Sequence, residues 1–172
     1  MASIIERLRE TLDEEVSLYE TLLEVSRKKT QVIIAEKLEE LTAITDEEQA
    51  LVDRITNVDN TRSKIMEEVA AVLGTDAEQL KLDALVRALE KRPEEQKPLA
   101  ETAEKLGRVV RQVRGVNYQN KELIDSALEM IEFEMNLLHS SRSAPQTANY
   151  GKGAYSTGDI LGTGISGFDA KQ

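Results

Sequence analysis

The chain of 172 residues contains no cysteine and no tryptophan, and only 3% of its residues are aromatic. Without cysteine, neither a disulfide framework nor a thiolate zinc site is possible. Glycine and proline are absent between Met1 and Leu73, and glycine stays scarce until the C-terminal part. Because turn formers are few while Leu, Ala, Glu, Lys and Arg dominate, the composition predicts long helices.

The chain also lacks a long hydrophobic run. Its longest purely apolar run, residues 69–73, is far shorter than the roughly 20 residues that a membrane span needs. The N-terminus becomes charged at Glu6 and has no apolar signal-peptide core. We therefore expect a soluble, cytoplasmic protein without membrane insertion.

Basic side chains are outnumbered by acidic ones, 22 to 32, which gives a net charge of −10. Binding to phosphates requires a basic face that releases counterions, so we expect no nucleic-acid partner. The charge is uneven along the chain. Residues 1–139 carry 19 basic and 30 acidic side chains, whereas residues 140–172 carry three and two.

Helical periodicity dominates the first half of the chain. A capping box at Ser3–Glu6 predicts a helix start. Steps of three and four then define a first stripe at Ile5, Leu8, Leu12, Val16, Tyr19 and Leu22, which resumes at Ile33. A second stripe follows at Leu38, Leu41, Ile44, Leu51, Ile55, Val58, Ile65, Val69 and Val72. One helix over this length would be roughly 105 Å long. We expect the chain to fold back between Ala35 and Thr45, with a second capping box at Thr45 as one candidate.

Turn signals separate the next elements. Gly74 predicts a helix end, and the capping box that begins at Thr75 predicts a restart. A short apolar face then runs over Leu82, Leu85, Val86 and Leu89. Either Pro93 or Pro98 is expected in the first turn of the last helix, where a missing N–H is harmless.

The last helix shows the clearest pattern, a seam with heptad-like spacing. It comprises Leu99, Ala103, Leu106, Val110, Val113, Asn117, Asn120, Ile124, Ala127, Ile131, Met135 and Leu138. Such a seam is typical of a long helix packed along its length. The chain is therefore expected to be an all-α, up-and-down bundle of long antiparallel helices over residues 1–139.

Residues 140–172 contain six of the nine glycines and five serines, which predicts a flexible tail. Its apolar points are Tyr150, Tyr155, Ile160, Leu161, Ile165 and Phe168. Aromatic side chains in such a segment have no core to fill, so we expect them to bind a partner. Leu161, Ile165 and Phe168 also have helical spacing, which suits a segment that folds against that partner.

Signatures of catalysis are missing. A carboxylate–histidine metal site in a helical bundle needs Glu-x-x-His pairs on two helices, but the chain has one histidine, His139, without an acidic residue three positions earlier. The glycine-rich run 162–167 lacks the Gly-Lys-Ser/Thr of a phosphate loop. We expect no enzyme, no cofactor and no metal.

A few polar residues fall on apolar stripes. Asn117 and Asn120 interrupt the seam, where they either fix the packing register or face a partner. Glu48 and Arg62 lie on the second stripe and can pair with a neighbouring helix or with a partner. We expect Tyr19 and Tyr118 at the core or its boundary.

The ordered combination of these segments resembles the FlgN family of chaperones for flagellar hook-associated proteins. The resemblance includes Leu8, Leu12, Glu15, Tyr19, Leu22 and Leu23, then Leu41, Glu48–Leu51 and Arg62, then Asn117, Asn120–Ile124 and Ile131, and finally Tyr150–Gly153. It implies four helices, three long and one short. It also implies that the chain binds C-terminal amphipathic segments of hook-associated proteins and docks at the flagellar export gate.

The resemblance further implies that client binding lies largely in the C-terminal region, and Tyr150, followed by Tyr155, best fits gate docking. Two other classes remain open. A scaffolding coiled-coil protein would self-associate through the seam as a homo-oligomer. A helical regulator would instead act through modified tail tyrosines.

Overall fold

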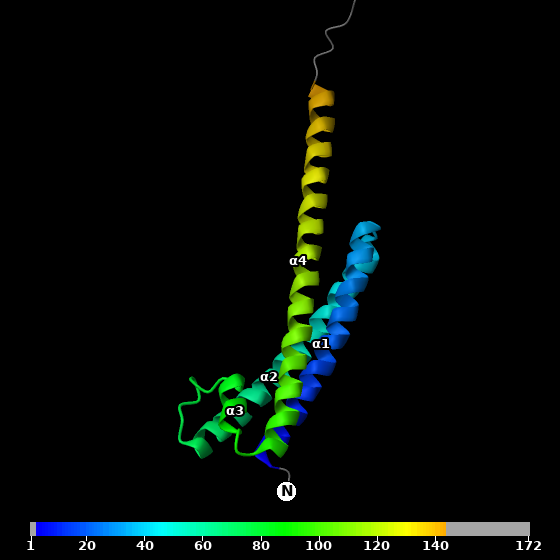
Figure 1. The fold of residues 1–172 in the computed structure, drawn as a ribbon. Helices are drawn as coiled ribbons and strands as arrows, with labels where there is room; N and C mark the ends of the chain where they lie inside the picture. Colours follow the sequence, from blue (N-terminus) through cyan, green and yellow to red (C-terminus); the bar gives the residue numbers. More distant parts are fainter. Residues whose placement is uncertain (1–2, 144–172) are drawn as a thin grey trace, which may run out of the picture. The chain divides into compact units, whose positions relative to one another are not determined.

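The computed structural model describes residues 3–143, which form four helices (Figure 1). These are α1 (Ile4–Ile34), α2 (Leu38–Leu73), α3 (Leu82–Ala88) and α4 (Pro93–Ser143). No strand occurs among the described residues, so the predicted all-α class, with three long helices and one short helix, is confirmed. The chain divides into two units, Met1–Glu134 and Met135–Gln172. The described part of the second unit is the end of α4.

The first helix begins and ends at local signals. Ser3 Oγ accepts a hydrogen bond from Glu6 N at 3.1 Å, as the predicted capping box requires. The chain turns back over residues 35–37, where Lys37 N donates to Val32 O and Glu36 adopts a left-handed φ of 56°. This is a helix-ending motif that normally uses glycine.

The fold-back therefore lies at the N-terminal limit of the predicted range. Thr45 was a candidate for this break, and that alternative is wrong, because Thr45 lies inside α2. Its hydroxyl donates to Leu41 O of the preceding turn at 2.8 Å. A capping-box pattern thus occurs in the middle of a helix, since its side chains are equally compatible with an exposed helix surface.

Helices α1 and α2 form an antiparallel hairpin (Figure 1). Three cross-helix polar pairs fix its register: Arg7 with Glu68 at 3.0 Å, Glu15 with Arg62 at 3.3 Å, and Ser26 with Glu48 at 3.0 Å. The residue number rises along α1 while its partner's number falls along α2, as antiparallel packing demands.

The second helix ends at Gly74, as predicted. Gly74 has φ of 64°, and Thr75 N donates to Ala70 O across it. The restart predicted at Thr75 is wrong, since α3 begins only at Leu82. Asp76 instead organises a turn, in which its carboxylate accepts from Glu78 N and its carbonyl from Leu80 N.

The start of α4 settles the two proline alternatives. Pro93 is the first residue of α4, where its missing N–H is harmless, and Pro98 lies inside the helix. Polar pairs between α1 and α4 join Asp13 to Thr102, Glu20 to Lys105 and Ser26 to Asn120. Both numbers rise together, so α4 runs in the same direction as α1.

The predicted up-and-down order of a four-helix bundle is therefore not confirmed, nor is its coiled-coil-like packing. The core instead joins the α1–α2 hairpin to α3 and to the first part of α4. Its members are Ile5, Leu8, Leu12, Val16, Leu18, Leu22, Leu23 and Val25 of α1, Leu51, Ile55, Ile65 and Val69 of α2, Leu85 of α3, Leu89 just after it, and Leu99, Leu106, Val109 and Val113 of α4. Two members of the predicted second stripe, Leu38 and Val72, are exposed because they lie in the terminal turns of α2.

Candidate functional site

The apolar seam of α4 loses its cover partway along the helix. Residues 99–113 contribute to the core, and Asn120 is buried, but every residue from Asp125 to Arg142 is exposed. In the first unit the large exposed apolar side chains of this region are Leu128, Met130, Ile131 and Phe133, which we call the α4 apolar surface. The seam prediction is wrong for Ala127 and Ile131, because no other described helix covers them.

In the second unit, the described end of α4 likewise exposes Met135, Leu137 and Leu138. The seam prediction is wrong there too. Large exposed apolar side chains grouped on one stretch of helix indicate an interaction site. At 100° per residue Leu128 and Ile131 share one side of α4, whereas Phe133 lies on the other side. The α4 apolar surface is therefore the candidate binding surface.

A polar cluster marks the place where the seam leaves the core. Asn120 Nδ2 donates to Ser26 O at 2.9 Å, and Thr30 Oγ1 donates to Asn120 Oδ1 at 2.5 Å. Nearby, Glu48 accepts from Ser26 Oγ at 3.0 Å and pairs with Lys29 at 2.5 Å. Because buried polar groups are costly without partners, this cluster fixes one register of α1, α2 and α4.

A groove of about 350 Å³ opens beside this cluster. All three long helices line it: Leu22 and Lys29 of α1, Val52 of α2, and Asn117 and Ile124 of α4 are among its residues. Leu22 is buried, whereas Val52 and Asn117 are exposed. The groove thus has an accessible mouth, and its buried wall combines apolar Leu22 with polar Asn120. Ile124 connects the groove to the seam.

A second polar cluster lies deeper between α1 and α2. The Glu15 side chain is 3% exposed, and one of its oxygens lies 3.3 Å from the Arg62 guanidinium, which also pairs with Asp59. The other oxygen, Oε1, accepts no hydrogen bond from a described residue. Burial raises the pKa of Glu15 to about 7, against the lowering effect of Arg62, and Asp59 raises it further.

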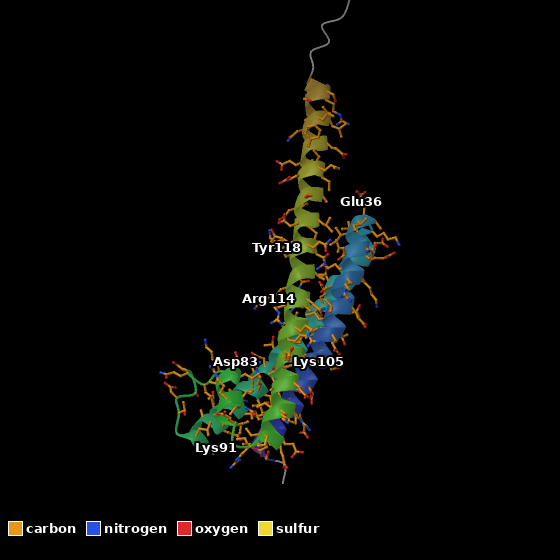
Figure 2. All side chains as sticks on the ribbon, in the orientation of Figure 1. Glu36, Asp83, Lys91, Lys105, Arg114 and Tyr118 are labelled. Atoms are coloured by element: carbon orange, nitrogen blue, oxygen red, sulfur yellow. The ribbon has the colours of Figure 1, made fainter. Side chains whose placement is uncertain are left out.

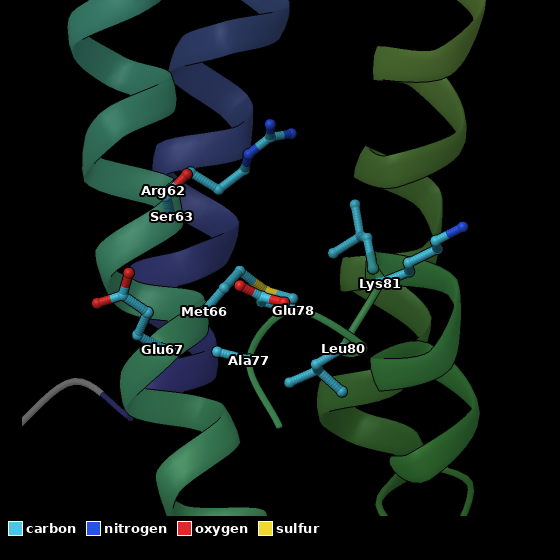
Figure 3. Close-up of a pocket in the computed structure, with 9 residues that line it drawn as sticks. Arg62, Ser63, Met66, Glu67, Ala77, Glu78, Leu80 and Lys81 are labelled. Carbon is cyan, nitrogen blue, oxygen red and sulfur yellow. The ribbon is translucent and has the colours of Figure 1, made fainter. Parts of the chain in front are cut away.

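Another hollow, of about 400 Å³, lies between α2 and the segment that leads into α3 (Figure 3). Met66 of α2 and Glu78 of the segment that leads into α3 both line it (Figure 3). Arg62 also lines this hollow but already pairs with Glu15 and Asp59. Arg62 is therefore already engaged, although Lys81 also lines the hollow, and we assign the hollow no ligand.

The polar residues that the sequence singled out have different places. Asn120 is buried and bonded within the fold, whereas Asn117 is exposed at the groove. Glu48 and Arg62 both pair with α1, one of the two expected alternatives. The remaining predicted binding residues lie outside the described part of the chain: Tyr150, Tyr155, Ile160, Leu161, Ile165 and Phe168.

The two tyrosines differ. Tyr19 is half-buried, as predicted. Tyr118 is exposed and lies on the side of α4 away from α1, so its prediction is wrong (Figure 2). Sequence reasoning also missed Leu128, Met130 and Phe133 as surface residues. The available signal was length, because the seam spans about 40 residues whereas α1 is 31 residues long.

Among residues 3–143, no three His, Asp or Glu side chains gather as metal ligands. Within the same range, no helix is both long and apolar enough to cross a membrane.

Comparison with known proteins identifies a family. Residues 1–157 match the family described as FlgN protein, which covers most of the chain and agrees with the predicted resemblance. No curated protein and no solved structure matches. A match of this extent means that the chain belongs to the FlgN family of flagellar export chaperones.

Proposed function

We propose that this chain acts in the cytoplasm as an export chaperone for hook-associated proteins, prevents their premature assembly and delivers them to the flagellar export gate. The observation that carries this proposal is the α4 apolar surface. Its four side chains, Leu128, Met130, Ile131 and Phe133, are each more than half exposed. Because no other described helix covers this part of α4, an amphipathic client segment can pack against it.

The size of this surface suits a reversible complex. Completing the burial of a large apolar side chain that is about half exposed contributes roughly 1 kcal/mol. Four such side chains therefore supply only part of a strong binding energy once the cost of ordering a client segment is subtracted. Moderate affinity is what a chaperone needs, because the client has to leave at the export gate.

The C-terminal residues extend the proposed binding region. We assign Ile160, Leu161, Ile165 and Phe168 to client contact, with Tyr150 and Tyr155 as the aromatic docking residues. Tyrosine provides a large contact area at low entropy cost. Tyr150 is our assignment for the export gate, with Tyr155 as the second choice.

Calorimetry with C-terminal peptides of hook-associated proteins tests the function. We expect binding by the full chain that falls strongly in Leu128→Ser and Ile131→Ser. The matched control is Leu38→Ser, which alters an exposed apolar residue at the start of α2. A chain truncated after Ser140 then separates binding by α4 from binding by the C-terminal residues. If no such peptide binds the full chain, the proposed function is wrong.

Self-association is the second candidate function, because an uncovered apolar helix side also suits a second copy of the chain. Sedimentation equilibrium of the full chain without clients distinguishes the two. A monomer supports the chaperone, whereas a stable oligomer that Ile131→Ser dissociates supports a scaffolding protein.

A further inference from the structure

One side of α4 is covered by other helices at its start and exposed further along, and it is mostly apolar in both parts. Successive residues of an α-helix are rotated by 100°, so Val113, Asn120, Ile124, Leu128 and Ile131 share one side. Val113 and Asn120 are buried, Ile124 is half-buried, and Leu128 and Ile131 are 59% and 53% exposed. A helix laid against this side would continue the packing that α1 and α2 provide at its start.

The groove lies where α1 and α2 stop covering α4. Ile124 belongs to it, together with Leu22 on α1, Val52 on α2 and Asn117 on α4. Its volume of about 350 Å³ is larger than one large apolar side chain. A helix on the uncovered side of α4 that ran toward the core would therefore bring its terminal side chain to the groove.

The net charge of the residues around this side determines which kind of partner helix it attracts. Residues 121–134 contain one basic and five acidic side chains, a net charge of −4. Asp125 already pairs with Lys121 at 2.7 Å. Glu132 and Glu134 lie on opposite flanks of the uncovered side and form no ion pair with a described residue. A second copy would bring the same acidic flanks, whereas basic flanks would be attracted.

We propose that the groove and the adjoining side of α4 bind one amphipathic helix that carries basic flanks. Its apolar side packs on Leu128 and Ile131, its terminal apolar side chain enters the groove, and its basic residues face Glu132 and Glu134. This inference rests on the proposed function, since the client is the helix concerned. It adds an anchoring groove and a charge requirement.

Two synthetic helical peptides test it, with identical leucine stripes but with flanks of lysine in one and of glutamate in the other. Two exposed ion pairs should make the lysine peptide bind the full chain about two- to thirtyfold tighter than the glutamate peptide. Glu132→Lys/Glu134→Lys should remove this preference, whereas Glu10→Lys/Glu14→Lys, which reverses two exposed charges on α1, should keep it. Equal affinity of the two peptides overturns the charge requirement.

The groove is tested by filling it. Asn117→Trp should weaken the lysine peptide about tenfold, the loss of one anchored apolar side chain. Gln119→Trp is the matched control, because it changes an exposed amide two residues away that does not line the groove. Thermal unfolding of both variants establishes that each is folded. If Asn117→Trp binds like the wild type, the groove is not the anchor.

The same measurements keep this inference separate from the function. Binding of hook-associated peptides that Ile131→Ser abolishes but Asn117→Trp leaves unchanged retains the chaperone and overturns the anchoring groove. Binding of the lysine peptide at the groove, with no binding of hook-associated peptides, retains the inference and overturns the assigned clients.

Discussion

Replacing Glu15 by glutamine should make the protein more stable at neutral and alkaline pH, although it removes one partner of an ion pair. Glu15 is almost fully buried between α1 and α2, and its Oε1 accepts no hydrogen bond from a described residue. Its single link is the contact of 3.3 Å with Arg62, which is 31% exposed and also pairs with Asp59. One partly solvated partner does not offset the desolvation of a buried carboxylate.

The pKa gives the magnitude and the sign. Burial raises the pKa of Glu15 from its ordinary value of 4.5 to about 7, which corresponds to about 3 kcal/mol at 1.36 kcal/mol per pKa unit. A raised carboxyl pKa means that the folded state holds the proton longer than the unfolded state does. This stabilisation is complete below the ordinary pKa and is lost as the pH rises through about 7.

The assay is urea unfolding of the wild type and Glu15→Gln at about pH 5 and about pH 8, followed by the helical circular dichroism signal. The difference in unfolding free energy between the variant and the wild type cancels the contributions of the other carboxylates. It should be small at the lower pH and should rise toward at most about 3 kcal/mol in favour of Glu15→Gln at the higher pH. Glu14→Gln, at the exposed neighbouring position, should show no such rise. A variant that is less stable than the wild type at the higher pH would refute the reasoning.

Three further changes test the fold by chemical denaturation. Glu36→Gly should stabilise the protein by about 1 kcal/mol, because residue 36 has φ of 56°, a conformation that costs glycine little; unchanged stability would contradict this. Asn120→Ala should destabilise it by about 2 kcal/mol, because Ser26 O and Thr30 Oγ1 lose their buried partner; a loss below about 0.5 kcal/mol would mean that water replaces the amide. Leu99→Ala should cost about 3 kcal/mol at a fully buried site, whereas Leu38→Ala, at an exposed one, should cost almost nothing.

Local chemistry made several elements predictable from the sequence. Ser3 caps α1, Gly74 ends α2 in a left-handed conformation, and Pro93 begins α4. Each signal acts within a few residues, on backbone groups that have no helical partner, so it works without knowledge of the rest of the fold. The family resemblance was likewise predictable, since it depends on the order of such segments along the chain.

The same kind of local pattern gave wrong predictions where two conformations satisfy it. The capping boxes at Thr45 and Thr75 match the sequence rule, yet Thr45 lies inside α2 and Thr75 precedes a turn. The chain folds back at residues 35–37 instead, where Glu36 accepts a left-handed conformation that its own preference opposes. The packing of α1 against α2 outweighs that local cost.

For the candidate site, the sequence by itself determined the stripe along α4 but not its surroundings. The periodicity is the same at Val113, which is buried, and at Ile131, which is exposed. Asn117 and Asn120 are likewise equivalent in the pattern, yet one lines a groove and the other bonds to α1. Only the tertiary structure decided these differences, because periodicity fixes which side chains share a helix side, whereas burial depends on whether another helix lies opposite them.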